Sequence, residues 1–549
     1  MAQLMGRMMQ SPLMISSLLR HAARHAGDVE IVSRRVEGDV HRSNWATLER
    51  RARQCAQALA ALGCEPGDRV ATLAWNGYRH LEIYYASSGS QLVCHTINPR
   101  LFPEQIAWIA DDGQDRVLCL DLSFLPLVEQ LAPQLTTVKH FVLMCDRDRM
   151  PVQTTLPNPL CYEDLVAAQD GAYAWPDFDE NTASSLCYTS GTTGNPKGAL
   201  YSHRSTLLHA FGSALPDSLN LSARDVVMPV VPMFHVNAWS IPYGAAMVGC
   251  KLVLPGPHLD GASLYALMEA EQVTFSAGVP TVWLGLLAYV KAQGLRFTTL
   301  RRTAIGGSAC PPAMMRTFKN DYGVDVIHAW GMTEMSPLGT VAALRHRHEK
   351  LSSTERASLL ATQGRAVYGV DMAIIDDAGH ALPWDGEAAG NLVVRGPWVI
   401  DRYHGVDASP LVSVDGEPGW FPTGDVASID PEGFMKITDR SKDVIKAGGE
   451  WISSIELENI AMSHPAVHEA AVIACPHPKW DERPLLVVVL REGAQATREE
   501  LLAHFDERIA RWQIPDDVVF LTEIPHTATG KVQKLRLREQ LGGYRLPGV

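Results

Sequence analysis

The sequence lacks the residue patterns that identify several common protein classes. Its ten cysteines are scattered singly, with neither a C-x-x-C pair nor another paired spacing, so neither a zinc site nor a disulfide framework is predicted. We expect these cysteines to be small core residues in a reducing cytosol, which predicts a cytoplasmic protein. Internal repeats and low-complexity tracts are also missing, which excludes the repeat architectures.

No apolar run is long enough for a signal peptide or a membrane span. Residues 1 to 19 place Met and Leu in an amphipathic pattern, with Arg7 inside the segment and Arg20 after it. A packed N-terminal helix is the favoured interpretation. A peripheral membrane contact and a dimer contact stay open as alternatives.

The chain has a deficit of positive charge, with 48 Lys and Arg against 61 Asp and Glu and a formal net charge of -13. This argues against a nucleic-acid-binding surface, which needs a basic face for phosphate contacts. Any polyanionic ligand must then be met by local positive charge. The 549 residues, 46% of them hydrophobic and 20% charged, predict a soluble protein of two or more domains.

One polar run has a composition suited to holding phosphate. Residues 189 to 198 read TSGTTGNPKG, where glycines allow close backbone approach and hydroxyls, amides and an ammonium can share a polyanion's charge. The alternative is a surface turn, but apolar, strand-like stretches at 183–188 and 198–201 flank the run. It is not a Walker A loop, because the glycine and lysine spacing differs. The candidate phosphate-binding residues are Thr189, Ser190, Gly191, Thr192, Thr193, Gly194 and Lys197.

Further motifs follow in order along the chain. They are HAWGMTE at 328–334, TGD at 423–425, DRSKDVIK at 439–446 and TGK at 529–531. With the phosphate run, they resemble the acyl-adenylate-forming superfamily over nearly the whole chain. VPMFHVNAW at 231–239 and AGGEWIS at 447–453 are similar to its medium- and long-chain fatty acyl-CoA synthetase branch, and the sequence looks closest to bacterial medium-chain ligases.

The fold class expected is α/β. Short apolar runs alternate with helical patterns, which favours mostly parallel sheets flanked by helices in an N-terminal domain, 1–438, with a small β-subdomain at about 364–438. A small α+β C-terminal domain, 439–549, follows, and the resemblance implies that it is mobile about Lys442. The helices expected include 45–62, with Asn44 as its cap and Gly63 at its end, and 454–462 and 498–512. The strands expected include 70–75, 92–97, 225–231, 251–254, 273–277, 302–305, 372–375, 391–395, 470–474, 485–490 and 518–524.

The chemistry that the resemblance implies starts from an inert carboxylate. Its attack on the α-phosphorus of ATP gives acyl-AMP and pyrophosphate, and the thiol of coenzyme A then displaces AMP. Such catalysis depends on positioning and cationic stabilisation. By resemblance, Glu334 and Thr189 bind Mg²⁺, Thr333 contacts the α-phosphate, and Lys531 bridges the carboxylate and the α-phosphate.

The resemblance also implies the nucleotide and thioester sites. Trp330 stacks on adenine, Asp425 accepts hydrogen bonds from the ribose hydroxyls, and Arg440 contacts ribose in one domain orientation. His328 and Ala329 replace a Gln-Gly pair that is frequent in the family. The remaining nucleotide candidates are Gly307, Ser308, Gly331, Lys442 and Lys446, and the face that admits coenzyme A carries Gly448, Gly449 and Trp451.

The acyl pocket is predicted around His235, Val236 and Trp239, where apolar bulk and polar groups adjoin. A fatty carboxylate is already ionised at neutral pH, so adenylation requires no general base. We therefore expect His235 to position the substrate or to be a packed structural histidine. The resemblance makes Trp239 the gate of an apolar tunnel.

The leading hypothesis is an ATP- and Mg²⁺-dependent medium-chain fatty acyl-CoA synthetase. Alternatives are a ligase for a short substituted acid of the methylthiopropionate type and an adenylation enzyme that loads a carrier protein in trans. A non-catalytic nucleotide-binding protein is disfavoured, because Lys531, Glu334 and Asp425 are all present. The resemblance further implies a homodimer.

Overall fold

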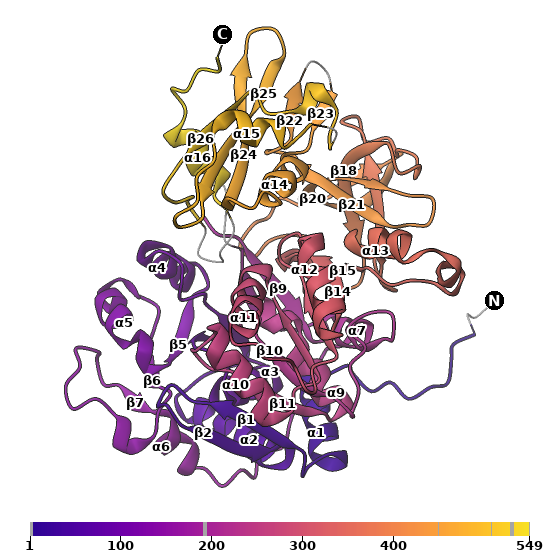
Figure 1. The fold of residues 1–549 in the computed structure, drawn as a ribbon. Coiled ribbons are helices and arrows are strands. Elements are labelled where there is room, and N and C mark those ends of the chain that lie inside the picture. Colours follow the sequence, from indigo (N-terminus) through magenta and orange to yellow (C-terminus); the bar gives the residue numbers. More distant parts are fainter. Residues whose placement is uncertain (1–3, 190–194, 448–449, 507, 527–531, 548–549) are drawn as a thin grey trace.

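The computed structural model describes residues 4–189, 195–447, 450–506, 508–526 and 532–547, with the backbone alone at 450 and 451. Within these residues the strands form four sheets. Two large, mostly parallel sheets and their helices make the N-terminal body, the third sheet lies beside it, and the fourth belongs to a small C-terminal unit above it (Figure 1). The predicted α/β class, with a large N-terminal domain and a small C-terminal one, is confirmed.

The two large sheets consist mostly of parallel strands. In the described residues one runs in the order β16 (Arg365–Ala366), β15 (Leu338–Val341), β14 (Asp325–Gly331), β13 (Arg302–Ile305), β12 (Phe275–Gly278), β10 (Val226–Pro229), β11 (Lys251–Leu254), β1 (Glu30–Arg34), β2 (Val40–Asn44). The other runs in the order β7 (Leu160–Cys161), β6 (His140–Leu143), β5 (Asp115–Leu120), β3 (Arg69–Leu73), β4 (Val93–Thr96), β8 (Ala183–Tyr188), β9 (Gly198–Ser202). Among the described strands, antiparallel pairs occur only towards the ends of these orders, at β1/β2, β14/β15, β15/β16 and β8/β9.

The two smaller sheets follow one another along the chain. The third sheet contains β17 (Asp371–Ile375), β18 (Ala389–Arg395), β19 (Val412–Val414), β20 (Glu417–Ile429) and β21 (Met435–Arg440). The fourth contains β22 (Ile445–Ala447), β23 (Glu450–Ile452), β24 (Val467–His477), β25 (Asp481–Leu490) and β26 (Asp517–Phe520). Strand β21 runs through position 438, where the N-terminal domain was predicted to end. At the end of β21, Arg440 pairs with Asp425 of β20.

Helices cover the sheets of the N-terminal body. They are α1 (Ile15–His25), α2 (Trp45–Ala61), α3 (Tyr78–Gly89), α4 (Pro103–Asp112), α5 (Leu125–Leu131), α6 (Tyr162–Ala167), α7 (His203–Ala214), α8 (Val236–Trp239), α9 (Ile241–Val248), α10 (Gly261–Glu271), α11 (Pro280–Ala292), α12 (Pro312–Arg316) and α13 (Ser353–Ala361). The C-terminal unit contributes α14 (Ser454–Met462), α15 (Arg498–Ala503) and α16 (Lys534–Gln540).

Local sequence signals explain many of these boundaries. Helix α2 begins after Asn44, whose side chain accepts a hydrogen bond from the Thr47 N–H, and ends before Gly63, which has a φ of 78°. The expected strands are present with ends shifted by a few residues. The cysteines are unpaired, and all except the half-buried Cys64 are buried.

Two helix predictions are corrected. The helix expected over 498–512 ends at Ala503, and the chain then turns so that Phe505 is fully buried in the C-terminal core. The N-terminal helix begins only at Ile15. Before it, Leu4, Met8 and Met9 are more than four-fifths exposed, and an amphipathic segment without packing contacts gains little helical stability. The tail leads away from the body (Figure 1).

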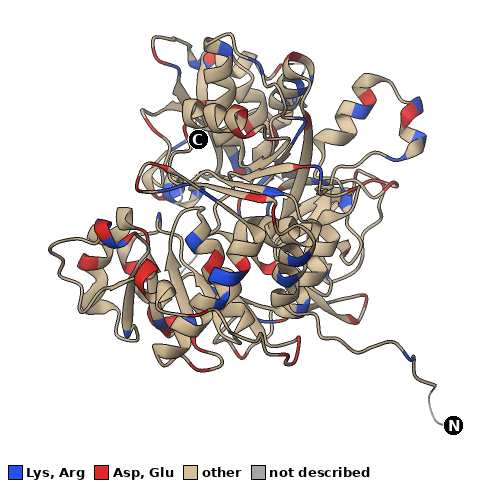
Figure 2. Ribbon diagram, turned by 90° about the horizontal axis from the view of Figure 1, so that it is seen from below, with Lys and Arg blue, Asp and Glu red and all other residues tan. Residues whose placement is uncertain are grey.

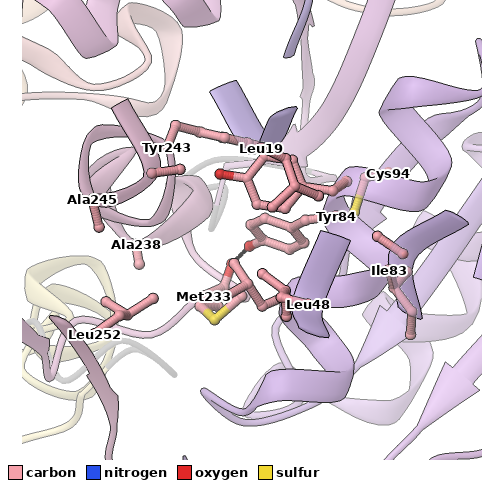
Figure 3. Close-up of a cluster of buried hydrophobic side chains, with 14 of the residues drawn as sticks. Leu19, Leu48, Ile83, Tyr84, Cys94, Met233, Ala238, Tyr243, Ala245 and Leu252 are labelled. Atoms are coloured by element: carbon pink, nitrogen blue, oxygen red, sulfur yellow. Dashed lines mark hydrogen bonds between the residues drawn. The ribbon is translucent and has the colours of Figure 1, made fainter. Parts of the chain in front are cut away.

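A buried aromatic cluster connects the N-terminal helices to the segment before α8 (Figure 3). The ring of Tyr84 from α3 stacks near Tyr243 of α9, with 6.0 Å between centroids. The Tyr84 hydroxyl donates a hydrogen bond to the Met233 carbonyl, two residues before His235. The core thus fixes the position of the predicted acyl-binding segment.

In Figure 2 the Lys and Arg positions are interspersed with Asp and Glu positions along the ribbon. Among the described helices, none has both the length and the apolar character needed to cross a bilayer.

Candidate active site

A cleft of about 1020 Å³ is lined by residues from several of the sequence motifs. Its walls come from the ends of β13 and β14, the segment before α8, the third sheet, and the C-terminal unit. The predicted residues that line it are Thr189, Lys197, His235, Val236, Trp239, Gly307, Ser308, His328, Ala329, Trp330, Gly331, Thr333, Glu334, Asp425, Arg440 and Lys442.

Some predicted residues are not brought to this cleft. Lys446 lies on β22, has an exposed side chain and is not part of the cleft wall; its backbone N–H donates to Glu482 at 2.9 Å. Ser190, Gly191, Thr192, Thr193, Gly194, Gly448, Gly449, Lys531 and the side chain of Trp451 lie outside the described residues.

The cleft lies at the carboxyl ends of parallel strands, where open α/β sheets bind ligands. The chain leaves β13 directly into Gly306 and Gly307, and β14 ends at Gly331. Gly307 has a φ of 79°, and a Cβ there would lie 3.2 Å from Val279 Cγ1. A glycine is therefore required for the turn that exposes Ser308 to the cleft.

Trp330 and Asp425 form one unit. Trp330 is 8% exposed, and its indole N–H donates to Asp425 Oδ2 at 3.0 Å. Asp425 Oδ1 lies 2.8 Å from Nε of Arg440, whose side chain is 45% exposed. The buried carboxylate is thus held between an aromatic ring and a cation from the neighbouring strand.

Two glycines fit the backbone around Trp330. A Cβ on Gly331 would lie 2.0 Å from the Pro337 carbonyl oxygen, and one on Gly339 would lie 2.6 Å from the Trp330 ring. Real Cβ atoms essentially never approach heavy atoms closer than 3.0 Å. Both positions therefore require glycine if the Trp330 to Glu334 segment is to keep its place.

Glu334 is a buried carboxylate at the wall of the cleft. It sits in a 3-10 turn, Thr333–Met335, and is 6% exposed. Burial raises the pKa of Glu334, and a hydrogen bond from the Tyr403 hydroxyl to Oε1 at 2.7 Å opposes that rise. The turn is also anchored by the Tyr201 hydroxyl, which donates to the Thr333 carbonyl at 2.5 Å.

The described ends of the phosphate run approach each other. The Thr189 N–H donates to the Lys197 carbonyl at 2.9 Å, and the Lys197 N–H donates to Thr189 Oγ1 at 3.2 Å. The ammonium of Lys197 lies 5.0 Å from the centroid of the Tyr403 ring, a cation–π distance.

The oxygen donors of the cleft fit Mg²⁺. This ion prefers one or two carboxylates, water and substrate phosphate oxygens to an all-protein cage. Glu334 offers a carboxylate and Thr189 a hydroxyl, and both residues line this cleft. Among the described residues, no group of three His, Cys, Asp or Glu side chains could hold a metal by itself.

His328 has a structural contact that its place in the motif did not indicate. It is 1% exposed, and its Nε2 accepts a hydrogen bond from the Cys310 N–H at 3.3 Å. Burial lowers the pKa of His328 to about 4, so the ring is neutral at physiological pH. It holds the chain after Gly306–Ala309 against β14.

The predicted acyl segment adopts an unusual backbone. Five consecutive residues from Val236 to Ser240 have φ between 46° and 58°, a left-handed conformation that costs roughly 1–2 kcal/mol per L-residue. Buried Asn237 holds it, since its Oδ1 accepts from Cys187 Sγ at 2.9 Å and its Nδ2 donates to the Tyr243 hydroxyl at 3.3 Å. This turn places Trp239 against Gly306, where a Cβ would lie 3.3 Å from the indole.

Two of these contacting residues were missed by sequence reasoning. Tyr403 stands in an Asp-Arg-Tyr-His run that carries no recognisable motif, and Asn237 was read only as part of a motif. Only their contacts with Glu334, Lys197 and Tyr243 identify them.

The comparisons with known proteins identify the family. Residues 18–404 match the model of the AMP-binding enzyme family, and residues 456–531 match that of the AMP-binding enzyme C-terminal domain. The chain belongs to the AMP-binding enzyme family. Its assignment from sequence to the adenylate-forming superfamily, as an AMP-forming acid–thiol ligase, is confirmed.

Particular relatives cover almost the full length. The 3-methylmercaptopropionyl-CoA ligase of Ruegeria lacuscaerulensis is 56% identical over 98% of this chain and 99% of its own. The medium-chain-fatty-acid–CoA ligase of Ectopseudomonas oleovorans is 54% identical over 99% of this chain and 98% of its own. Among solved structures, that of the anthranilate CoA ligase AuaEII with anthranoyl-AMP has a TM-score of 0.85 and 25% identity, covering 97% of this chain and 98% of its own.

Proposed function

We propose that this ligase activates a medium-chain fatty acid with ATP and transfers the acyl group to coenzyme A. The observation that carries the proposal is the convergence in one cleft of Thr189 and Lys197, Glu334, Asp425 and the His235–Trp239 segment. These are the phosphate, metal, ribose and acyl elements that acyl adenylation requires. We further propose the division into residues 1–438 and a C-terminal domain, 439–549, that reorients about Lys442.

In the first half-reaction, a carboxylate oxygen of the fatty acid attacks the α-phosphorus of ATP, and pyrophosphate leaves. Lys197, Thr333 and Lys531 stabilise charge on the phosphate oxygens. Mg²⁺ held by Glu334 and Thr189 would neutralise part of the phosphate charge. In the second, the thiol of coenzyme A loses its proton, its sulfur attacks the acyl carbonyl, and AMP leaves.

The nucleotide is proposed to lie along the Trp330–Asp425 unit. Trp330 presents its ring to adenine while its N–H orients Asp425, whose carboxylate can accept from the ribose hydroxyls. Gly307, Ser308, Ala329 and Gly331 shape the adenine pocket, and Arg440, Lys442 and Lys446 contact nucleotide in one domain orientation or the other. Gly448, Gly449 and Trp451 form the face for coenzyme A.

The acyl chain is proposed to enter beside His235 and Val236, with Trp239 as a gate. A short substituted acid of the 3-methylmercaptopropionate type is a second candidate substrate. The relatives at 56% and 54% identity are named for 3-methylmercaptopropionate and for medium-chain fatty acids, respectively. Both substrates present a carboxylate to the same cleft, so the acids must be compared directly.

The test is pyrophosphate release together with thioester detection, across straight-chain acids from two to eighteen carbons and 3-methylmercaptopropionate. We expect the highest kcat/KM at medium chain length. A maximum at the short substituted acid would select the second candidate, and release of pyrophosphate without free acyl-CoA would favour a carrier-loading enzyme. No AMP from any acid would reject the proposal.

We also propose a cytoplasmic homodimer. The exposed Leu4, Met8 and Met9 form an apolar tail that a second copy can cover, which burial of apolar surface would stabilise. Sedimentation at several concentrations tests this proposal. A variant beginning at residue 12 is expected to shift toward monomer, and an unchanged sedimentation coefficient would contradict that role of the tail.

A further inference from the structure

A short strap of chain connects the two halves of the phosphate-handling site. The Ile400 N–H donates to the Glu334 carbonyl at 2.9 Å, and the His404 N–H donates to the Gly198 carbonyl at 2.8 Å. Residues 400–404 therefore tie the turn that carries Glu334 to the strand that follows the phosphate run.

Tyr403 is the side chain of this strap that faces both groups. Its hydroxyl donates to Glu334 Oε1 at 2.7 Å. Its ring centroid lies 5.0 Å from the Lys197 ammonium, and Phe421 packs edge-on at 6.2 Å. One half-buried residue thus contacts a carboxylate through its polar end and a cation through its aromatic face.

We infer that Tyr403 is a positioning residue that orients Glu334 for the magnesium ion and keeps Lys197 available to the phosphates. A carboxylate has two oxygens, and a hydrogen bond to Oε1 orients the group while leaving Oε2 for a metal. Groups that hydrogen-bond a metal ligand in this way set its geometry.

A direct ion pair between Lys197 and Glu334 is the alternative to their separate contacts with Tyr403. A buried carboxylate and a nearby ammonium attract each other, and a direct ion pair would withdraw both from the substrate. In the described part of the chain, no ion pair joins Lys197 and Glu334, and Tyr403 contacts each of them. A neutral ring can approach the ammonium, and its hydroxyl satisfies the carboxylate without cancelling its charge.

This inference rests on the proposed function, because it assigns Tyr403 to the site of Mg²⁺ and ATP. Tyr403→Phe keeps the ring and removes the hydroxyl, whereas Tyr403→Leu removes both contacts. Tyr368→Phe is the matched control, since Tyr368 lies in the same part of the chain and is 90% exposed.

The first readout is binding, without turnover. Mn²⁺ is titrated into each variant with a non-hydrolysable ATP analogue, and bound metal is followed by electron paramagnetic resonance. Tyr403→Phe is expected to bind the metal about 10- to 100-fold more weakly, the usual effect of losing such a partner, while Tyr368→Phe matches the wild type.

The second readout is the Mg²⁺ dependence of pyrophosphate release. Tyr403→Phe should regain its kcat at high Mg²⁺ with an unchanged KM for the acid. Tyr403→Leu should keep a lowered kcat even there, because Lys197 has lost its ring contact.

Metal titrations of Tyr403→Phe that superimpose on those of the wild type would overturn the inference. That conclusion does not depend on whether Tyr403→Leu folds. A wild type that binds metal and nucleotide but forms no acyl-CoA would instead reject the proposed function, so the two failures are distinguishable.

Discussion

Gly331→Ala should disable the active site through a single added methyl group. The Cβ would lie 2.0 Å from the Pro337 oxygen, 2.7 Å from its carbonyl carbon and 3.3 Å from the Leu338 Cα. All three are backbone atoms, so no side chain can rotate away. Reaching even 3.0 Å requires a displacement of about 1 Å.

The displaced backbone at Gly331 lies between residues that the candidate site requires. Trp330 precedes Gly331, and Thr333 and Glu334 follow it within three positions. A misplacement of about 1 Å in a positioned site can cost on the order of 10²-fold in rate. Overpacking of this kind also destabilises a fold by roughly 1–3 kcal/mol.

The assay is kcat/KM for ATP from pyrophosphate release, with the thermal midpoint measured beside it. Gly285→Ala is the control, because Gly285 lies in α11 and its added Cβ has nothing within 4 Å. It should leave activity unchanged and leave stability equal or slightly higher, since alanine favours helix. A Gly331→Ala enzyme within twofold of the wild type would refute the steric reasoning.

Three further substitutions test individual side chains. Asp425→Ala should raise the KM for ATP and destabilise the fold by about 1–3 kcal/mol, since the buried Trp330 N–H loses its acceptor; an unchanged KM would contradict the ribose role. Because burial raises the pKa of Glu334, the folded state binds its proton more tightly than the unfolded state, and the stability contributed by protonation is lost as pH rises through that pKa. Glu334→Gln should be inactive, because it loses the proposed metal-binding carboxylate. Without ligands, the variant should be at least as stable as the wild type at pH 8, and this advantage should shrink at pH 5. A higher thermal midpoint of the wild type at pH 8 would contradict this expectation. Lys531→Ala should lower the rate of pyrophosphate release by about 10²- to 10³-fold, and full adenylation by this variant would remove Lys531 from the mechanism.

Much of the fold was predictable because its signals are local. The side chain of Asn44 and the left-handed Gly63 bound α2 as the sequence indicates. The strands that lead into the cleft were also predictable, because apolar runs ending in glycine mark them. Helix α15 was predicted too long, since burial of Phe505 in the C-terminal core overrides the local helical pattern after Ala503.

Some residues of the candidate site were predictable from the sequence, and others were not. Glu334, Trp330, Asp425 and Lys197 were predictable from motifs, and all of them line the cleft. The inward, structural role of His328 was not predictable, because its partner, the Cys310 N–H, comes from the chain after another strand.

The sequence by itself determined the class of chemistry, because its motifs, in this order along the chain, resemble those of the acyl-adenylate-forming superfamily. Only the tertiary structure decided which groups hold them in place. The contact of Tyr403 with Glu334 joins positions 69 residues apart, and that of Trp330 with Asp425 joins positions 95 apart. Such pairings depend on how the sheets pack together, which no local pattern of residues encodes.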